Sequence, residues 1–153
     1  MNAALAAWNR LERKPFGKTL FSRAICFKAP YFGSISPRFV ELRPGFARVS
    51  MRKRRAVQNH IGTVHAIAMC NLAEIAAGTL TEISIPESMR WLPKGMAVEY
   101  LKKAETDVEA TATLPPVDAG AAREVPATVE VRDREGTVVC RAVITMWVSP
   151  RRK

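Results

Sequence analysis

The sequence is poor in the residues that build metal and disulfide sites. Its 153 residues include only three cysteines, Cys26, Cys70 and Cys140. The histidines are His60 and His65, and no cysteine stands at ligand spacing from either of them. An odd number of cysteines without a C-x-x-C pair argues against a disulfide framework or a zinc knuckle. We therefore expect no metal site and a reducing, cytoplasmic compartment.

Long hydrophobic runs and glycine-rich phosphate loops are also missing. No apolar run approaches the ~20 residues that a membrane-spanning helix needs, and the first residues are not followed by the apolar core of a signal peptide. The absence of a G-x-G-x-x-G or P-loop motif argues against a nucleotide-binding doubly wound fold. With 48% apolar residues, the chain still has enough material for one well-packed domain.

Acidic residues are scarce in the first part of the chain. Residues 1–60 contain 13 Lys and Arg but only Glu12 and Glu41, whereas residues 61–147 contain 8 basic and 12 acidic residues. This asymmetry predicts a positive surface that meets nucleic acid, anionic lipid or a phosphate-bearing small molecule. A solvated surface that only keeps the protein soluble is the plainer alternative.

The hydrophobic pattern changes three times along the chain, from helical to alternating, back to helical, and again to alternating. Two short helices are predicted at 3–13 and 17–28, the second with Leu20, Ala24 and Phe27 on one stripe. Two strands follow at 37–43 and 46–53, joined by a turn with Pro and Gly at its centre.

A long helix and a second group of strands follow. Residues 63–83 are apolar almost all round, which predicts a helix buried on most sides, and Thr63 can cap its start. Strands are then predicted at 96–103, 107–114, 125–131 and 138–147. Tight turns between consecutive strands favour an antiparallel sheet. The sequence therefore predicts an α+β fold in which five or six strands curl around one central helix.

The residues with chemical capability gather where this long helix begins. Asn59, Gly62 and His65 precede the helix, and Glu74 is its only carboxylate before Glu82. A helix N-terminus presents free N–H groups that stabilise a developing oxyanion, and a carboxylate among apolar neighbours is a candidate general base or nucleophile. The structural alternatives remain open: an ion pair with an arginine for Glu74, a contact with a backbone carbonyl for His65, and a turn for Asn59.

The spacing of these residues predicts more than one chain in the site. His65 and Glu74 are nine residues apart, which in a regular helix places them on opposite sides and about 13.5 Å apart along the axis. A single small site cannot use both unless the helix starts irregularly or a second copy supplies one of them. A twofold dimer would bring the helix start of one chain near Glu74 of the other.

The pattern N-x-x-G-x-x-H, followed by an acidic residue nine positions after the histidine, resembles the hotdog-fold acyl-CoA thioesterases, in particular those of the phenylacetic-acid pathway type. The resemblance covers roughly residues 33–149. It implies a hotdog domain over 33–149, an N-terminal helical extension over 1–32 and a basic tail over 150–153. It also implies a homodimer or homotetramer and no cofactor, the CoA moiety being part of an acyl-CoA or acyl-carrier substrate.

The resemblance further implies roles for individual residues. Glu74 would act as base or nucleophile, and Asn59 and His65 would position substrate and water. Gly62 would belong to the substrate-binding loop, and the thioester oxygen would accept a backbone N–H near Ala66 and Ile67.

The sequence departs from the family where His65-Ala66-Ile67 stands in place of His-Gly-Gly. Glycine lets a substrate approach the backbone closely, so this variant also fits a non-catalytic module that binds an acyl chain or CoA. The basic run that includes Arg54 and Arg55 lies just before the motif and is a candidate for the CoA phosphates.

A third alternative is a basic protein that binds a membrane surface or nucleic acid. Trp8, Phe16, Phe21 and Phe27 stand among basic residues, as in interfacial helices. A nucleic-acid partner is not expected, because the chain has few aromatic residues and no recognisable RNA-binding motif.

Overall fold

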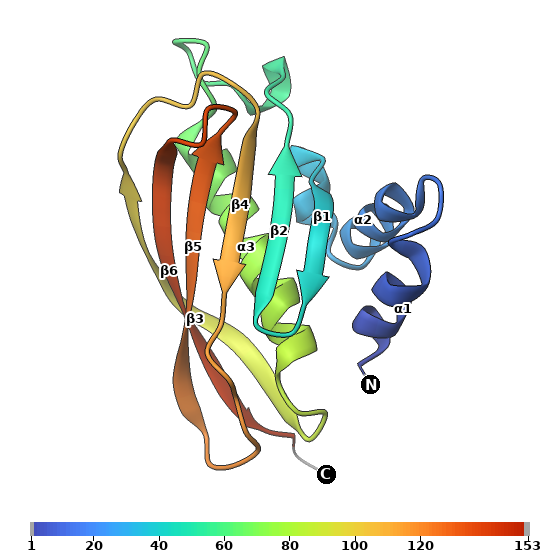
Figure 1. The fold of residues 1–153 in the computed structure, drawn as a ribbon. Coiled ribbons are helices and arrows are strands. Elements are labelled where there is room, and N and C mark those ends of the chain that lie inside the picture. The colour runs from blue at the N-terminus through green and yellow to red at the C-terminus, as the bar shows by residue number, and fades with distance from the viewer. Residues whose placement is uncertain (1, 152–153) are drawn as a thin grey trace.

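Helix α3 (Ala66–Ser84) is the centre of the fold, and the sheet wraps around it (Figure 1). The computed structural model describes residues 2–151. Most side chains of α3 are buried, as its all-round apolar pattern predicts. The helix has the length and composition of a membrane span, but two thirds of it (67%) is buried inside the protein, as in the core helix of a globular domain.

The start of α3 differs from the prediction. The helix begins at Ala66, three residues later than expected, and its N-cap is His65 rather than Thr63. The His65 Nδ1 atom accepts a hydrogen bond from the Ile67 N–H at 3.0 Å. Thr63 is instead held by the preceding loop, where its hydroxyl accepts a hydrogen bond from Asn59 Nδ2 at 2.8 Å.

The sheet is antiparallel and has six strands in the order β1-β2-β4-β5-β6-β3. The strands are β1 (Arg38–Arg43), β2 (Phe46–Met51), β3 (Met89–Tyr100), β4 (Val108–Thr113), β5 (Arg123–Asp133) and β6 (Val138–Pro150). The predicted α+β fold, a central helix wrapped by a curved antiparallel sheet of the hotdog type, is therefore confirmed.

Strand β3 is longer than the pattern predicts, because it begins at Met89 rather than at residue 96. Its pairing with β6 shifts register between Pro93 and Gly95. Proline and glycine are rare inside strands and typical of bulges and edges, so the alternation breaks there and hides the first half of the strand. β3 lies at one edge of the sheet and pairs with β6 alone.

The opposite edge, β1, is covered by the N-terminal helices α1 (Ala3–Leu11) and α2 (Gly17–Lys28) (Figure 1). Trp8, Phe21 and Phe39 form a cluster of edge-to-face rings there, with neighbouring centroids 5.2 to 6.4 Å apart. All three side chains belong to the same buried cluster as the residues of α3 and the sheet. The extension predicted at 1–32 thus packs into the main core, and its division from the domain stays a prediction.

The predicted stripe on α2 faces away from this cluster. Leu20 and Phe27 are exposed, and the buried side of the helix carries Phe21 and Ser22 instead. The Ser22 Oγ atom accepts the Phe39 N–H at 2.9 Å, which fixes α2 to β1. The short 3-10 helix η1 (Pro30–Ile35) then leads into β1. Of the tail predicted at 150–153, Pro150 ends β6, Arg151 donates to the Met89 carbonyl at 2.9 Å, and the last two residues lie outside the described range.

Candidate active site

The motif loop before α3 is built around the Asn59 side chain. Its Oδ1 atom accepts the N–H groups of Ile61 at 3.2 Å and Thr63 at 3.1 Å. Gly62 adopts a φ of +79°, a conformation that side-chain-bearing residues rarely accept. Asn59 therefore shapes the loop, which agrees with the turn role that the sequence left open for it.

Backbone bonds hold this loop against its neighbours. The His65 N–H donates to the Val57 carbonyl at 2.8 Å, and the Val64 N–H donates to the Ala104 carbonyl at 2.8 Å. The second bond ties the helix start to the segment that follows β3. As a result, the motif and the end of β3 face the same space.

A pocket of about 380 Å³ opens between these two segments. Asn59, Ala66 and Met69 line it from the motif side, and Tyr100, Leu101, Lys102 and Lys103 line it from the end of β3. The second group could not be predicted from the sequence, because only the pairing of β3 with β6 shows that residues 100–103 come back to the helix start. Two adjacent lysines give this pocket cations that suit a phosphate-bearing ligand.

One of the N–H groups at the start of α3 already has a hydrogen-bond partner. The Ile67 N–H donates to the His65 ring, so that amide is not available to a thioester oxygen. No hydrogen bond from the Ala66 N–H to another described residue is present, and Ala66 lines the pocket. Of the two amides predicted as oxyanion donors, the structure therefore leaves that of Ala66 free. The Ile67 side chain is exposed beside it.

Cys70 and Tyr100 join the helix to β3 next to the pocket. Their Sγ and Oη atoms are 3.0 Å apart. The hydrogen bond to Cys70, together with burial, raises the pKa of Tyr100 to about 12. The tyrosine hydroxyl thus stays protonated at neutral pH, and the contact marks the face of α3 that borders β3.

Glu74 lies on that same face. It follows Cys70 by four residues and precedes Gly78 by four, and an added Cβ at Gly78 would lie 2.9 Å from the ring of Trp91 on β3. The Glu74 side chain is half-buried. Within residues 2–151 its carboxylate has no hydrogen bond or ion pair, so the predicted structural alternative, an arginine partner, is absent in the described chain.

Glu82 shows what a structural carboxylate looks like on the same helix. It accepts the Trp91 Nε1–H at 2.7 Å and the Asn2 side-chain amide at 3.0 Å. Glu74, one helical turn before Gly78, has no such partner and in this respect differs from Glu82. Asn59 lines the motif pocket, whereas Glu74 and His65 do not. That one chain does not bring Glu74 together with Asn59 and His65 stays a prediction.

A family model described as a domain of unknown function, DUF4442, matches residues 17–148. The chain belongs to this family. A crystal structure described as genomics APC5556 is 47% identical to this DUF4442 protein, with 97% of this chain and 98% of that one covered and a TM-score of 0.83. Among curated proteins, none matches the sequence significantly.

More distant structures share the fold of the DUF4442 protein. Zebrafish thioesterase superfamily member 2 is 18% identical, with 84% of this chain and 94% of that one covered and a TM-score of 0.73. A Haemophilus influenzae thioesterase is 15% identical, with 78% and 82% covered and a TM-score of 0.70. These likenesses confirm the predicted hotdog fold.

Arg54 and Arg55, the residues predicted to hold the CoA phosphates, do not line the motif pocket of the DUF4442 protein. Arg54 donates to the Ser34 carbonyl at 2.7 Å and to Ser36 Oγ at 3.2 Å, so it fixes η1. Arg55 begins the short 3-10 helix η2 (Arg55–Val57) and is exposed. Their role in substrate binding stays a prediction.

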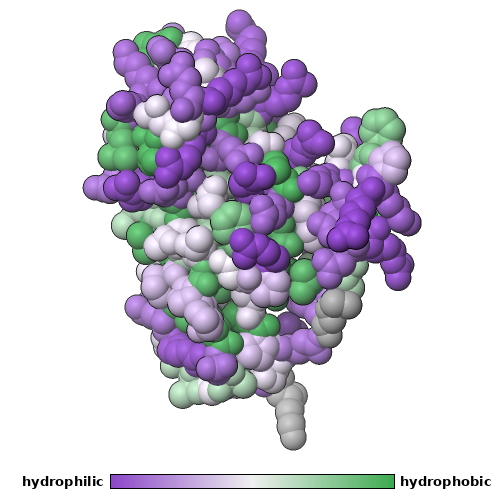
Figure 2. Space-filling model, viewed as in Figure 1, coloured by the Kyte–Doolittle hydropathy of each residue, from purple (hydrophilic) through white to green (hydrophobic). Residues whose placement is uncertain are grey.

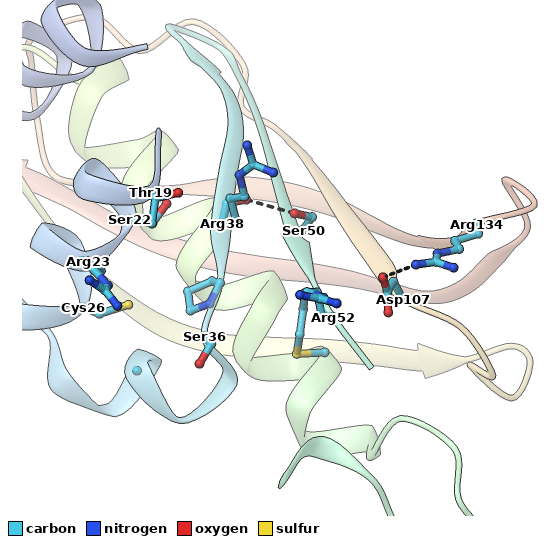
Figure 3. Close-up of a pocket in the computed structure, with 13 residues that line it drawn as sticks. Thr19, Ser22, Arg23, Cys26, Ser36, Arg38, Ser50, Arg52, Asp107 and Arg134 are labelled. Atoms are coloured by element: carbon cyan, nitrogen blue, oxygen red, sulfur yellow. Dashed lines mark hydrogen bonds and ion pairs between the residues drawn. The ribbon is translucent and has the colours of Figure 1, made fainter. Parts of the chain in front are cut away.

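A second, larger cavity of about 810 Å³ lies between α2 and the strands β1 and β2 (Figure 3). Four arginines line it, Arg23, Arg38, Arg52 and Arg134, against the single acid Asp107. Asp107 accepts a hydrogen bond from Arg134 at 2.6 Å, and the Lys53 N–H, Arg134 and the charge of Arg52 hold the pKa of its carboxyl below the usual value. Neither Glu74 nor His65 belongs to this cavity.

No group of three or more potential metal ligands occurs among residues 2–151. The three cysteines are free thiols.

Proposed function

We propose that this DUF4442 protein hydrolyses the thioester of acyl-CoA or of an acyl carrier, at a site built by two copies of the chain in a cytoplasmic compartment. The observation that carries the proposal is the unpartnered Glu74 carboxylate on the face of α3 that borders the free edge strand. The hotdog fold shared with proteins named thioesterases supports the same reading.

The free edge supports the two-chain site. β3 is long, pairs on one side only, and exposes Leu92, Met96 and Tyr100. An unpaired strand of this kind is a template for another strand, and twofold pairing of β3 with its copy would set the two α3 faces side by side. In that dimer, or in a tetramer made from it, the pocket of one chain can face Glu74 of the other.

The chemistry then follows from the groups present. Glu74 takes a proton from a water molecule while the water oxygen attacks the thioester carbonyl carbon. The carbonyl oxygen gains charge and accepts the Ala66 N–H. The C–S bond breaks, and the proton passes to the departing sulfur, which leaves a carboxylic acid and a free thiol. Direct attack by the Glu74 carboxylate, with later hydrolysis of the anhydride, is the nucleophilic variant of this scheme.

The decisive experiment is turnover of purified protein on a panel of acyl-CoAs with detection of free thiol. Glu74→Gln keeps the size of the side chain and should lower turnover by about 10²-fold or more, the scale of general-base catalysis. Glu74→Asp should retain part of the activity. Glu135→Gln, which removes an exposed carboxylate in the β5–β6 turn, is the matched control and should act like the parent.

The phosphate contacts can be tested in the same assay. Lys102→Gln with Lys103→Gln should raise KM for CoA thioesters and leave kcat unchanged. The reason is that these lysines would bind the CoA phosphates, which do not react and are the same in substrate and product. Arg54→Gln with Arg55→Gln tests the arginine prediction in parallel. If only the arginine pair raises KM, the lysine assignment is wrong.

A binding module without turnover is the second candidate, and the Ile67 position favours it. The Ile67 N–H already donates a hydrogen bond to His65, and the exposed Ile67 side chain lies at the start of α3. Calorimetry that shows acyl-CoA binding to the parent protein, without release of thiol from any member of the panel, would replace the enzyme by this module.

A further inference from the structure

The three most exposed large hydrophobic side chains among residues 2–151, Phe16, Phe27 and Tyr31, lie with the exposed Leu20 along α2 and at the start of η1. The exposed fractions are 88% for Phe16, 58% for Leu20, 92% for Phe27 and 70% for Tyr31. Exposed aromatic residues scattered singly need no explanation, but a contiguous set marks an interaction site.

Phe16, Leu20 and Phe27 fall on one side of α2, and Tyr31 follows in η1. Leu20 and Phe27 are seven residues apart, two turns of α2, and Phe16 precedes Leu20 by one turn. The other side of α2 packs Phe21 onto β1. We name the set Phe16, Leu20, Phe27 and Tyr31 the outer stripe.

Positive charge surrounds the outer stripe. No acidic residue occurs between Glu12 and Glu41, whereas Arg13, Lys14, Arg23 and Lys28 are all exposed. Lys18 is the exception, since it donates to the Val40 carbonyl at 2.6 Å and faces the sheet. In the space-filling view, hydrophilic side chains gather over this lobe around a hydrophobic group (Figure 2).

The arginine-lined cavity extends this charge along the flank of α2. Arg23 contributes to the cavity from α2, Arg38 from β1, and Arg52 from the residue that follows β2 (Figure 3). The side chains of these three arginines form no hydrogen bond or ion pair with any residue from 2 to 151. The charges of Arg23 and Arg38 are therefore available to an external anion, whereas that of Arg52 also acts on Asp107.

We propose that the outer stripe docks on the surface of a membrane that contains anionic phospholipids. Phe16, Leu20 and Phe27 enter the boundary between headgroups and acyl chains, while the flanking cations contact lipid phosphates. This docking is independent of the catalytic proposal, because it uses the β1 side of the protein and not the β3 side.

A second copy of the chain fits the outer stripe less well. Two copies would bring their basic lobes together unless an acidic surface of the partner faced the stripe. On the outer face of the sheet several acids already pair with cations: Glu109 with Arg48, Glu124 with Lys94, and Glu130 with Arg132 and Arg141. An anionic bilayer supplies the missing charge without this conflict.

The test is co-sedimentation of the full-length protein with vesicles of phosphatidylcholine alone and of phosphatidylcholine mixed with phosphatidylglycerol. The parent should bind the mixed vesicles much more strongly, and binding should weaken with salt. Leu20→Ser with Phe27→Ser should lower the partition coefficient by about tenfold or more. Arg23→Gln with Lys28→Gln should lower it by about tenfold on the mixed vesicles only.

Matched controls lie on the far side of the sheet. Trp147→Ser removes a partly exposed aromatic residue of β6, and Arg90→Gln removes an exposed cation of β3; both should bind as the parent does. The proposal fails if the parent does not bind the mixed vesicles, or if the Leu20→Ser, Phe27→Ser variant binds as well as the parent. It also fails if that variant loses a subunit in analytical sedimentation, because the stripe is then a contact between copies.

Discussion

The two edges of the sheet differ in whether other elements cover them. At β1, two helices cover the strand and bury the rings of Trp8, Phe21 and Phe39. At β3, a strand of twelve residues lies bare, with Leu92 and Met96 exposed. Proteins block sheet edges unless they use them. The difference therefore suggests that the β1 side contributes stability within the chain, whereas the β3 side is kept for a partner and for the chemistry of Glu74.

The largest expected effect tests the covered edge. Trp8→Ala should lower the free energy of unfolding by about 3–5 kcal/mol, because it removes a large, fully buried ring from the aromatic cluster. Trp147→Ala, near the bare edge, should cost about 1 kcal/mol, since that ring is partly exposed and holds mainly the Lys94 cation at 5.3 Å. Urea unfolding measures both. Equal losses would show that the two edges do not differ in this way.

The next effect tests the bare edge. Met96→Glu places a charge on the exposed part of β3 and should raise the dissociation constant of the dimer by about tenfold or more, because the carboxylate would be buried without a partner. Leu20→Glu, on the opposite side, should leave the dimer intact. Analytical sedimentation over a range of concentrations reads out both variants. A parent that is monomeric at all concentrations contradicts the two-chain site.

A smaller effect compares two glycines. Gly78→Ala puts a methyl group 2.9 Å from the Trp91 ring, whose indole donates a hydrogen bond to Glu82, so the ring or the strand that carries it must shift. We expect a loss of about 1 kcal/mol, overpacking outweighing the better helix propensity of alanine. Gly33→Ala on the β1 side meets only the Cys26 Cβ at 4.0 Å and should be neutral. Thermal unfolding distinguishes the two; a more stable Gly78→Ala variant would mean that β3 is loosely attached.

The smallest effect concerns acid stability. The pKa of Asp107 is lowered in the folded state, first by the Lys53 N–H and then by Arg134. A carboxyl of this kind stabilises the fold above its unfolded pKa of about 3.9, and that contribution is lost as pH falls below this value through the folded pKa. Asp107→Asn should thus cost less than about 1 kcal/mol at pH 7. The difference from the parent should vanish in strong acid, and a difference that stays constant with pH would exclude this origin.

The fold could be predicted further than the site. The bounds of α2 follow from the helix-breaking residues Pro15 and Pro30 on either side of it, although its predicted apolar stripe is exposed. The buried nature of α3 follows from its all-round apolar pattern. The first half of β3 could not be predicted, because the Pro93–Gly95 bulge breaks the alternation. The start of α3 was misplaced because a histidine ring caps it, a role that the usual capping residues Ser, Thr, Asp and Asn fill more often.

The candidate site also contains residues that the sequence reveals and residues that it does not. Asn59, Gly62 and Glu74 stand out in the sequence because each is a polar or flexible exception beside an apolar helix. Lys102 and Lys103 do not stand out, because their relevance depends on a strand end that returns to the helix start through pairing with β6. Likewise, no local pattern reveals that the Arg54 side chain donates a hydrogen bond to the Ser34 carbonyl of η1.

The strand order also has a consequence during synthesis of the chain. β3 pairs only with β6, and β4 and β5 are made in between. At ~5–20 residues per second, β3 waits about 2 to 8 seconds on the ribosome before its partner emerges. Throughout this interval both of its edges are open, and α3 alone can shield its inner face through the Trp91 contact. The Pro93-Lys94-Gly95 interruption, which obscures the strand in the sequence, then acts as protection against premature pairing with another nascent chain.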